Sequence, residues 1–340
     1  MPDTHFPTKS DKRITLKDVA RAADVSLASA SYAINGTGSV GDGVRAHILQ
    51  VAENLGYRRN LSARAVRTGK TGAIGLVVPD FTNPFFTHLA QSVMRAARLA
   101  GYCVFVTDTE ESENLEREAF KRMIDRGVDG IVWFPIRDVN TVEAQTRLAP
   151  TVLIDRSIKG LESIQADYIR GGQLAAEHLI GLGHSQIGIV AGPRDIVSQK
   201  QRIDGAAAAI KAHARLAFSV TNAFSMDLEP QVTKAIAAGK ATAIFAGTDL
   251  IALGVIRYAQ SLGLRVPEDL SVIGFGDMPW AHLGAVPLTT IEMPIDDMAQ
   301  AAVDAVLHRI DHRDSPPRTA FATSLIRRGS TAAPRMVKIA

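Results

Sequence analysis

The sequence is poor in cysteine and contains no long apolar run. Its single cysteine, Cys103, excludes an intramolecular disulfide framework and a cysteine-based zinc site. Because Cys103 lies in the apolar run 102–106, we expect a buried thiol. No segment approaches the ~20 apolar residues that span a bilayer, and the polar residues 1–13 lack the features of a secretory signal. We therefore expect a cytoplasmic protein that does not contact membranes.

The motifs of several common enzyme classes are also absent. The sequence has no phosphate-binding glycine loop, no Gly-x-Ser-x-Gly elbow and no His-Glu-x-x-His pair. His308 and His312, beside Asp304 and Asp311, have the spacing of metal ligands on a helix, but such a pair is more typical of a solvated helix face. We therefore expect no catalytic residue, no metal ion and no cofactor.

Length and charge distribution indicate several folding units. With 340 residues and 46% hydrophobic content, the chain is long enough for two or three units with sizeable cores. The first 70 residues carry 11 Lys and Arg against 6 Asp and Glu, whereas the remainder carries 27 against 29. A concentrated basic excess is typical of a partner rich in phosphate, although a basic tail or a solvated face has the same composition.

The basic segment predicts three short helices. Thr15 and Asp18 have the spacing of a capping box, which starts the first helix. Ser26 can cap a second helix over 27–34, and a third, amphipathic helix covers about 43–55. Small alanines let the first two helices approach closely, which favours a helix-turn-helix that enters the DNA major groove. A small helical bundle that binds another protein is the alternative.

From Gly72 onward, β-rich runs alternate with amphipathic helical segments. The expected strands are 73–78, 103–107, 130–134, 151–154, 186–191, 243–246, 270–275 and 288–291. The expected helices are 85–100, 114–126, 172–182, 250–262 and 296–310. This alternation implies parallel sheets covered by helices. The number of expected strand–helix units is larger than a single sheet would hold. We therefore expect two doubly wound α/β lobes.

Short motifs spread along the chain resemble one known family. They are residues 14–20, 25–26, 34–35, 55–57, 74–77, 83–86, 129–131, 182–184, 191–193, 272–275 and 287–291. In this order they are similar to the lactose-repressor/galactose-repressor family of transcriptional regulators. The resemblance implies an α-helical helix-turn-helix head that binds DNA. It also implies a two-lobed, periplasmic-binding-protein-like core of doubly wound parallel sheets that binds a small effector.

The resemblance divides the chain into four parts. They are a polar tail at 1–13, a helix-turn-helix domain at 14–60, a hinge helix at 61–70, and an effector-binding and dimerisation core at 71–340. Within the core, the first lobe takes about 71–165 and 293–325, and the second about 166–292 and 326–340. The hinge is basic and would be a marginal helix on its own, so a flexible basic linker is the alternative.

By resemblance, the second helix of the head reads DNA. Leu27 and Ala28 face base edges and can make only apolar contacts, for example with a thymine methyl, while Tyr32 offers one hydroxyl. Further DNA contacts are assigned to Thr15, Ser26, Ser31, Asn35, Arg45, Tyr57, Asn60, Arg64 and Val66. Val66 takes the position of a wedge in the minor groove, where many relatives carry the longer leucine.

The residues that follow the strands predict a ligand site, because ligands of open α/β sheets bind at the carboxyl ends of the strands. These residues include Asp80, Phe81, Asp155, Arg156, Thr248, Asp249, Gly276 and Asp277. The resemblance assigns effector contacts to Phe85, Phe86, Asp155, Ser198, Arg202, Thr248, Gly276 and Asp277, with Phe224 or Ser225 as further candidates. The alternative to an effector contact of Asp155 is a local ion pair between Asp155 and Arg156.

Two departures from the family pattern bear on the effector. Gly276 stands where relatives often have aspartate, and Thr248 stands where they often have asparagine. Loss of a carboxylate makes an acidic ligand beside Arg202 more tolerable. A sugar acid or phosphorylated sugar is therefore favoured over a neutral sugar, unless Asp277 restores the lost acceptor.

We therefore expect a sequence-specific DNA-binding transcriptional regulator, in the simplest case a repressor. It would bind a pseudo-palindromic site in double-stranded DNA as a homodimer, with a tetramer left open. A small sugar or sugar derivative between the lobes would control this binding. The alternatives are a solute-binding receptor without DNA activity, which the basic head disfavours, and an α/β enzyme, which lacks catalytic motifs. The identity of the effector and the direction of its effect stay open.

Overall fold

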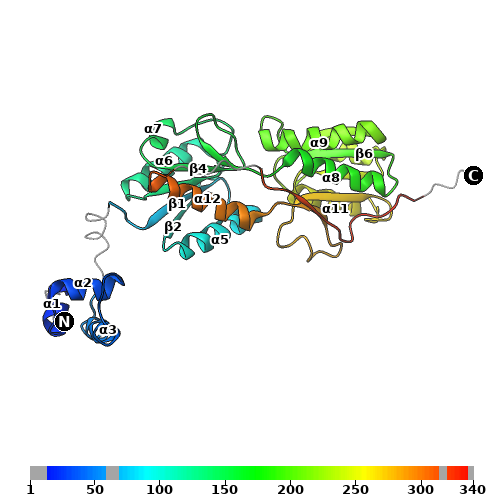
Figure 1. Ribbon diagram of the computed structural model, residues 1–340. Coiled ribbons are helices and arrows are strands. Elements are labelled where there is room, and N and C mark those ends of the chain that lie inside the picture. Colours follow the sequence, from blue (N-terminus) through cyan, green and yellow to red (C-terminus); the bar gives the residue numbers. More distant parts are fainter. Residues whose placement is uncertain (1–13, 59–68, 314–319, 336–340) are drawn as a thin grey trace, which may run out of the picture. The chain divides into compact units, whose positions relative to one another are not determined.

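The computed structural model describes residues 14–58, 69–313 and 320–335, and the chain separates into two compact units, Met1–Gly69 and Lys70–Ala340 (Figure 1). The predicted DNA contacts Asn60, Arg64 and Val66 lie outside the described residues. Among the residues that are described, no helix combines the length and the apolar character needed to cross a membrane.

The first unit is a three-helix head. Its helices are α1 (Leu16–Ala22), α2 (Leu27–Asn35) and α3 (Asp42–Asn54). They bury one small cluster, which consists of Val19, Ala20, Ala23, Ala30, Ala33, Ile34, Ile48 and Ala52. Because five of these eight side chains are alanine, the helix axes come close together, as the spacing predicted. The head therefore has the helix-turn-helix arrangement in α1 and α2.

The second unit begins with a parallel sheet. Within residues 69–313, five strands pair in the order β2-β1-β3-β4-β5. Their bounds are β1 Ala73–Val78, β2 Cys103–Asp108, β3 Gly130–Trp133, β4 Thr151–Ile154 and β5 Glu162–Ile164. The helices of this lobe are α5 (Pro84–Leu99), α6 (Glu113–Asp125), the short α7 (Glu143–Thr146) and α12 (Ile295–Ile310). The doubly wound lobe that the alternation predicted is therefore present.

A second sheet forms the other lobe. Across the described segments of the core its strand order is β11-β10-β9-β8-β6-β7, and only β11 runs antiparallel to its neighbour. The bounds are β6 Gln186–Ala191, β7 Arg215–Thr221, β8 Ala243–Ala246, β9 Ser271–Gly276, β10 Thr289–Glu292 and β11 Ser324–Ile326. The helices are α8 (Tyr168–Gly181), α9 (Val197–His213), α10 (Pro230–Ala237) and α11 (Asp249–Ser261). In Figure 1, α8, α9 and α11 lie with β6 in this lobe.

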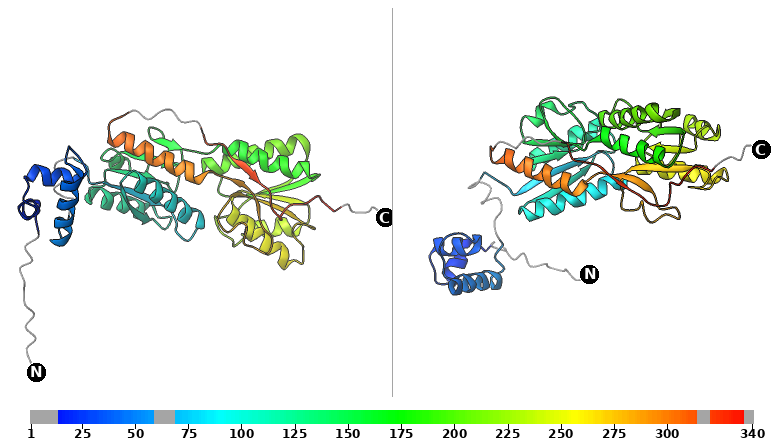
Figure 2. Two further views of the ribbon diagram at one scale, coloured as in Figure 1. Left: turned by 60° about the horizontal axis from the view of Figure 1, so that its bottom comes forward. Right: turned by 45° about the vertical axis from the view of Figure 1, so that its right-hand side comes forward.

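The chain passes between the lobes at several points. It leaves the first lobe between β5 and α8, returns between β10 and α12, and reaches the second lobe again at β11 (Figure 2). A parallel bridge between Ala166 and Phe321 joins two of these crossing segments. Because β11 pairs with β10 from Ser324 onward, the last change of lobe lies slightly before residue 325, the boundary that we expected.

The prediction of a buried thiol at Cys103 was wrong. Cys103 is exposed, because β2 is the edge strand of its sheet and Cys103 is its first residue. An apolar run at a sheet edge has a neighbouring strand on one side only, so alternate side chains stay in contact with solvent.

Candidate functional site

Helix α2 has a buried face and an exposed face. Its buried residues are Ala30, Ala33 and Ile34. On the other face, the side chains of Leu27 and Tyr32 are 45% and 47% exposed. Both side chains are therefore accessible to a partner molecule.

Local hydrogen bonds define both ends of α2. The Ser26 hydroxyl accepts a hydrogen bond of 3.0 Å from the backbone N–H of Ser29, which caps the helix as predicted. At the other end Gly36 adopts φ +68°, a left-handed conformation that favours glycine, and its N–H donates to Ala33. The Asn35 amide donates to the carbonyl oxygen of Ser31 at 2.8 Å. The polar residues assigned to phosphate contacts on α2 therefore also hold the helix ends.

The capping box at the start of α1 is present. The Thr15 backbone N–H and hydroxyl both donate to the Asp18 carboxylate, at 2.9 and 2.7 Å. This geometry orders the first turn of α1 and directs the Thr15 hydroxyl proton toward Asp18. A phosphate at this position would therefore interact with the helix N-terminus more directly than with the hydroxyl.

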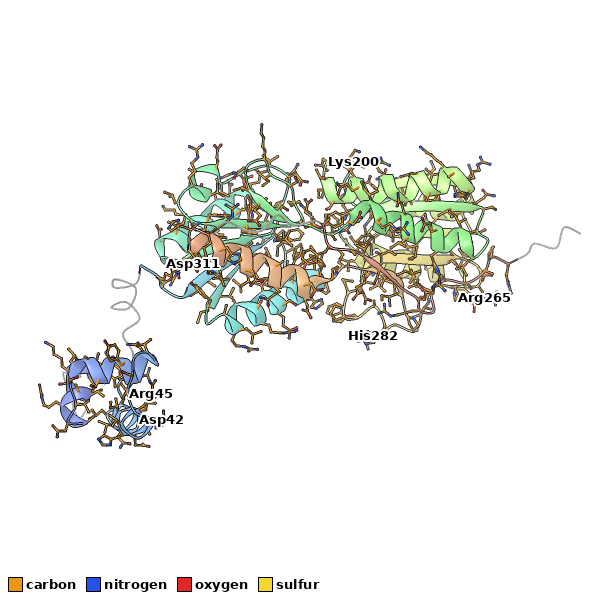
Figure 3. All side chains as sticks on the ribbon, viewed as in Figure 1. Asp42, Arg45, Lys200, Arg265, His282 and Asp311 are labelled. Carbon is orange, nitrogen blue, oxygen red and sulfur yellow. The ribbon has the colours of Figure 1, made fainter. Side chains whose placement is uncertain are left out.

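Two further candidates border the turn that follows α2. A Cβ atom on Gly38 would lie 2.7 Å from the Tyr32 ring, so the absence of a side chain there lets the ring lie against the turn. On α3, the Arg45 guanidinium lies within 4 Å of the position that a Cβ on Gly36 would take (Figure 3). Tyr57, in contrast, is half-buried against the core of the head. Tyr32 and Arg45 thus both lie beside the turn that follows α2, whereas Tyr57 also packs against the core of the head.

The core unit contains a cleft of about 720 Å³, part of it open to solvent, whose walls come from both lobes. Six of the eight predicted effector residues line it: Phe85, Phe86, Asp155, Arg202, Thr248 and Gly276. Lining residues that the effector assignment did not include are Asn83, Phe134, Arg156, Gln199, Asp249, Phe275 and Met293. The rule that ligand sites lie at the carboxyl ends of strands therefore located the cleft.

Three phenylalanines form one wall of the cleft. The rings of Phe85, Phe86 and Phe134 pack edge to face, with centroids 4.8 to 5.8 Å apart. The Arg156 guanidinium lies over the Phe134 ring at 4.8 Å, a cation–π geometry. This wall offers aromatic surface next to a positive charge.

Asp155 is the centre of a buried hydrogen-bond network. Its backbone has φ +70°, a strained conformation for a residue other than glycine. Its carboxylate accepts hydrogen bonds from the Tyr168 hydroxyl at 2.5 Å and the Ser198 hydroxyl at 2.9 Å, both from the second lobe. It also forms an ion pair with Arg156, which was the alternative to a ligand contact, and Arg202 lies 3.6 Å away. Burial raises the pKa of Tyr168 well above its usual value, so the phenol stays a donor.

Arg202 is held by several groups at once. Its Nη1 donates to the Gly247 carbonyl at 2.8 Å, and its guanidinium lies 4.0 Å from the centroid of the Phe275 ring. Burial lowers the pKa of Arg202, while the nearby Asp155 carboxylate acts to raise it. Because a guanidinium stays protonated at neutral pH, Arg202 brings a fixed positive charge to the cleft.

Two predicted effector residues are not among those that line the cleft. Ser198 is buried and directs its hydroxyl to Asp155. Asp277 forms an ion pair of 2.7 Å with Arg328. A carboxylate that pairs with an arginine of its own chain is a poor substitute for the acceptor absent at Gly276.

Asp249 is a buried carboxylate on the wall of the second lobe. It is fully buried and accepts hydrogen bonds from the Met278 N–H at 2.8 Å and from the Thr290 hydroxyl. Burial raises the pKa of Asp249 to about 6, although both hydrogen bonds act to lower it. The neighbouring Thr248 caps α11 through its hydroxyl, which accepts from the Ile251 N–H. The polar groups of Thr248 and Asp249 at this end of the cleft therefore already have hydrogen-bond partners within the chain.

The described residues contain no group of three or more His, Cys, Asp or Glu side chains that could hold a metal ion. The cleft combines aromatic surface, fixed arginines and hydrogen-bonding groups.

A helix-turn-helix head and a two-lobed α/β core with a polar cleft together define a DNA-binding regulator that is controlled by a small molecule. Residues 15–60 match the model described as bacterial regulatory proteins, lacI family, and residues 176–331 match a periplasmic binding protein-like domain. The chain belongs to the LacI family of bacterial regulatory proteins. The resemblance and the fold class expected from the sequence are confirmed.

Relatives with full-length similarity support this membership. The transcriptional regulator DegA of Bacillus subtilis is 32% identical over 84% of this chain and 88% of its own length. The Lac repressor dimer, solved with operator and the anti-inducer ONPF, is 26% identical and has a TM-score of 0.82 over 95% of this chain and all of its own. The regulator CelR in complex with cellobiose is 26% identical, with a TM-score of 0.69 over 94% of this chain and all of its own.

Proposed function

We propose that the protein is a sequence-specific repressor whose affinity for an operator is set by a sugar-like metabolite in the cleft. The observation that carries the proposal is the outer face of α2, where Leu27 and Tyr32 are exposed on a helix of helix-turn-helix geometry. The first 70 residues also carry an excess of Lys and Arg over Asp and Glu, which is the charge expected of a protein surface that binds DNA. A head that served only to pack against protein would not require this excess.

In this proposal Leu27 and Ala28 contact thymine methyl groups, and the Tyr32 hydroxyl bonds one base edge. Register on the duplex comes from phosphate contacts of the N-terminal ends of α1 and α2 and of Arg45. The proposed contacts of Tyr57 and Asn60 and, in the hinge, of Arg64 and Val66 rest on the sequence resemblance.

Two copies of the chain bind one pseudo-palindromic site in this proposal, because a single head offers too little surface for specific recognition. Apolar side chains of the first lobe that reach solvent support self-association. They are Met94 and Leu99 on α5, which are 43% and 80% exposed, and Phe105 on the edge strand β2, which is 43% exposed. A homodimer would cover these groups, and a tetramer stays open.

The proposed effector is a sugar or sugar derivative. Phenylalanine rings pack against the apolar face of a sugar ring, while fixed polar groups select its hydroxyls. The similar regulator CelR was solved with cellobiose. In the present chain Arg156 and Arg202 line the cleft, and their guanidinium groups are the positive charges with which the acidic sugar favoured by the sequence would pair.

A protein that binds operator DNA acts where the chromosome is, so we place it in the cytoplasm. The cleft would bind its ligand without chemical change, since Asp155 is paired with Arg156 and Asp249 accepts hydrogen bonds from Met278 and Thr290, so that neither carboxylate is poised as acid or base. The alternative of a solute-binding receptor leaves the exposed face of α2 without a role.

A gel-shift titration with DNA fragments from beside the gene, at physiological salt and with random DNA as competitor, tests the proposal. Wild type should select at least one fragment, and Tyr32→Ala should weaken that selection. Leu49→Ala on α3, where the side chain is 44% exposed, is the matched control and should leave selection unchanged. Equal affinity for all fragments and random DNA would refute sequence-specific binding.

A further inference from the structure

Asp138 connects the backbones of the two lobes beside the cleft. It lies in the first lobe, in the loop between β3 and α7. One carboxylate oxygen accepts a hydrogen bond of 2.6 Å from the N–H of Ser157, in the same lobe. The other oxygen accepts one of 2.8 Å from the N–H of Val197, the first residue of α9 in the second lobe. A single carboxylate thus joins two segments that reach the cleft from opposite sides.

Helix α9 has no cap of its own. Its N-cap residue is Ile196, which has no side-chain oxygen, and no side-chain capping bond is present. The first N–H groups of a helix have no partner within the helix and carry partial positive charge. Asp138 therefore supplies from the other lobe the acceptor that Ile196 lacks. This bond exists only while the two lobes are close.

Both bonded segments carry residues of the cleft. Ser157 directly follows Asp155 and Arg156. Val197 directly precedes Ser198, which bonds Asp155, and α9 also presents Arg202 to the cleft one turn further on. In Figure 3, Lys200 marks this first part of α9 in the second lobe. The two halves of the proposed effector site are thus aligned through backbone atoms next to the residues that line it.

We propose that Asp138 is a positioning residue of the effector site, which caps α9 across the cleft and thereby couples closure of the lobes to assembly of the site. The inference rests on the proposed function only in taking the cleft as the effector site. An effector that closes the cleft would then gain the capping bond together with its own contacts, although it never touches Asp138.

A neighbouring ion pair provides a matched control. Arg137, next to Asp138, lies 3.5 Å from Asp195 of the second lobe, and the two side chains are 60% and 64% exposed. Exposed pairs of this kind contribute little, because solvent screens them. Removal of Asp195 therefore deletes a cross-lobe contact at the same place without touching the cap.

The distance between the lobes can be measured in the full chain without effector or DNA. Cys103, the single and exposed cysteine, takes one spin label in the first lobe, and Lys240→Cys, at an exposed position before β8, takes the second. Labelled protein is diluted with unlabelled Cys103→Ser protein, so that pulsed electron paramagnetic resonance reports distances within one chain.

We expect Asp138→Ala to move the distance distribution to longer values and to broaden it. Asp138→Asn keeps an acceptor oxygen and should lie between wild type and Asp138→Ala, while Asp195→Ala should match wild type. Val197→Pro removes the N–H donor itself and should reproduce the effect of Asp138→Ala, because proline is well tolerated at the first position of a helix. This second variant leaves Asp138 in place if Asp138→Ala does not fold.

A melting temperature about 2–4 °C lower is expected for loss of one helix cap in a unit of this size. If the melting temperature falls but the distance distribution stays that of wild type, Asp138 is only a stabilising cap and the proposal is wrong. A failure of the gel-shift test would not affect this result, because neither DNA nor effector is present.

Discussion

Replacement of Asp249 by asparagine should make the core less dependent on pH. Burial raises the pKa of this carboxyl from 3.8 to about 6, so the folded chain holds a proton more tightly than the unfolded chain does. Between these two pKa values the folded state therefore binds more protons, and a fall in pH stabilises it. This sign is opposite to that of an aspartate in a salt bridge.

The magnitude follows from the same numbers. At pH 7.5 the Asp249 carboxyl is almost fully ionised in both the folded and the unfolded state. The free energy of unfolding at this pH is therefore the reference from which the gain at lower pH is counted. At pH 5, about one unit below the folded pKa, the wild type gains about 1 kcal/mol, and the gain grows further as the pH falls toward the unfolded pKa. The amide of Asp249→Asn can accept from the Met278 N–H and donate to the Thr290 oxygen, so both hydrogen-bond positions stay filled.

Urea unfolding at pH 5 and pH 7.5, followed by circular dichroism, measures the effect. The difference between the unfolding free energies of the two proteins cancels the contributions of the other titratable groups. One of these is His178, whose pKa burial lowers to about 4, so that its protonation destabilises the fold as the pH falls. Wild type should gain about 1 kcal/mol more than Asp249→Asn on acidification. Thr290→Val, which deletes a donor that lowers the Asp249 pKa, should enlarge the gain. Parallel pH profiles for wild type and Asp249→Asn would refute the reasoning.

Three further predictions concern DNA and effector. Tyr32→Ala should relax discrimination at one base position, whereas Ser26→Ala should weaken all sites about equally, as measured by selection from a randomised operator; equal patterns would mean that the outer face of α2 is misassigned. Val66→Asp should weaken the operator complex far more than the complex with random DNA in gel shifts, because a charge cannot wedge between stacked bases, and intact operator affinity would remove the hinge proposal. Calorimetry with paired neutral, acidic and phosphorylated sugars should show heat only for the anions and a loss of binding in Arg202→Ala, while binding of neutral sugars alone would exclude an acidic effector.

The strands that were predicted to the residue are those with a continuous apolar run and a clear boundary. Ala73–Val78 and Gln186–Ala191 belong to this group, since each is buried in the interior of a parallel sheet. The edge strand β7, Arg215–Thr221, was missed because its side chains are mostly half-buried and its sequence lacks a continuous apolar run. The half-buried edge strand β2 was nevertheless predicted, because it contains most of the continuous apolar run 102–106. The sequence pattern therefore reports a continuous apolar run, not strand formation itself.

Helix α9 was missed for a reason connected with function. Its buried residues include the polar Ser198, Gln199 and Arg202 at the N-terminal end, and apolar burial by Ile203, Ala206 and Ile210 begins only further along. A helix that turns polar groups inward toward a cleft shows a weakened amphipathic period. The periodicity that locates ordinary helices is therefore weakest at the end of α9 that carries Ser198 and Arg202.

The rule that ligands bind at strand ends located the cleft, but it did not predict the partners of each side chain. Asp277 follows β9 as Asp155 follows β4, and both adopt positive φ. Only the fold brings Arg328, from the segment after β11, to Asp277 and leaves Asp155 facing the second lobe. Pairings between segments so distant in sequence have no local signal.

The network around Asp155 has a consequence for sensitivity. Its carboxylate has an arginine, a phenol and a hydroxyl of the same chain as partners. If Asp155 contacts the effector as we propose, a metabolite would have to exchange with these groups, and its apparent dissociation constant would be the intrinsic one divided by the fraction of molecules in which they are released. Tyr168 and Ser198 would then set the concentration at which the proposed regulator responds.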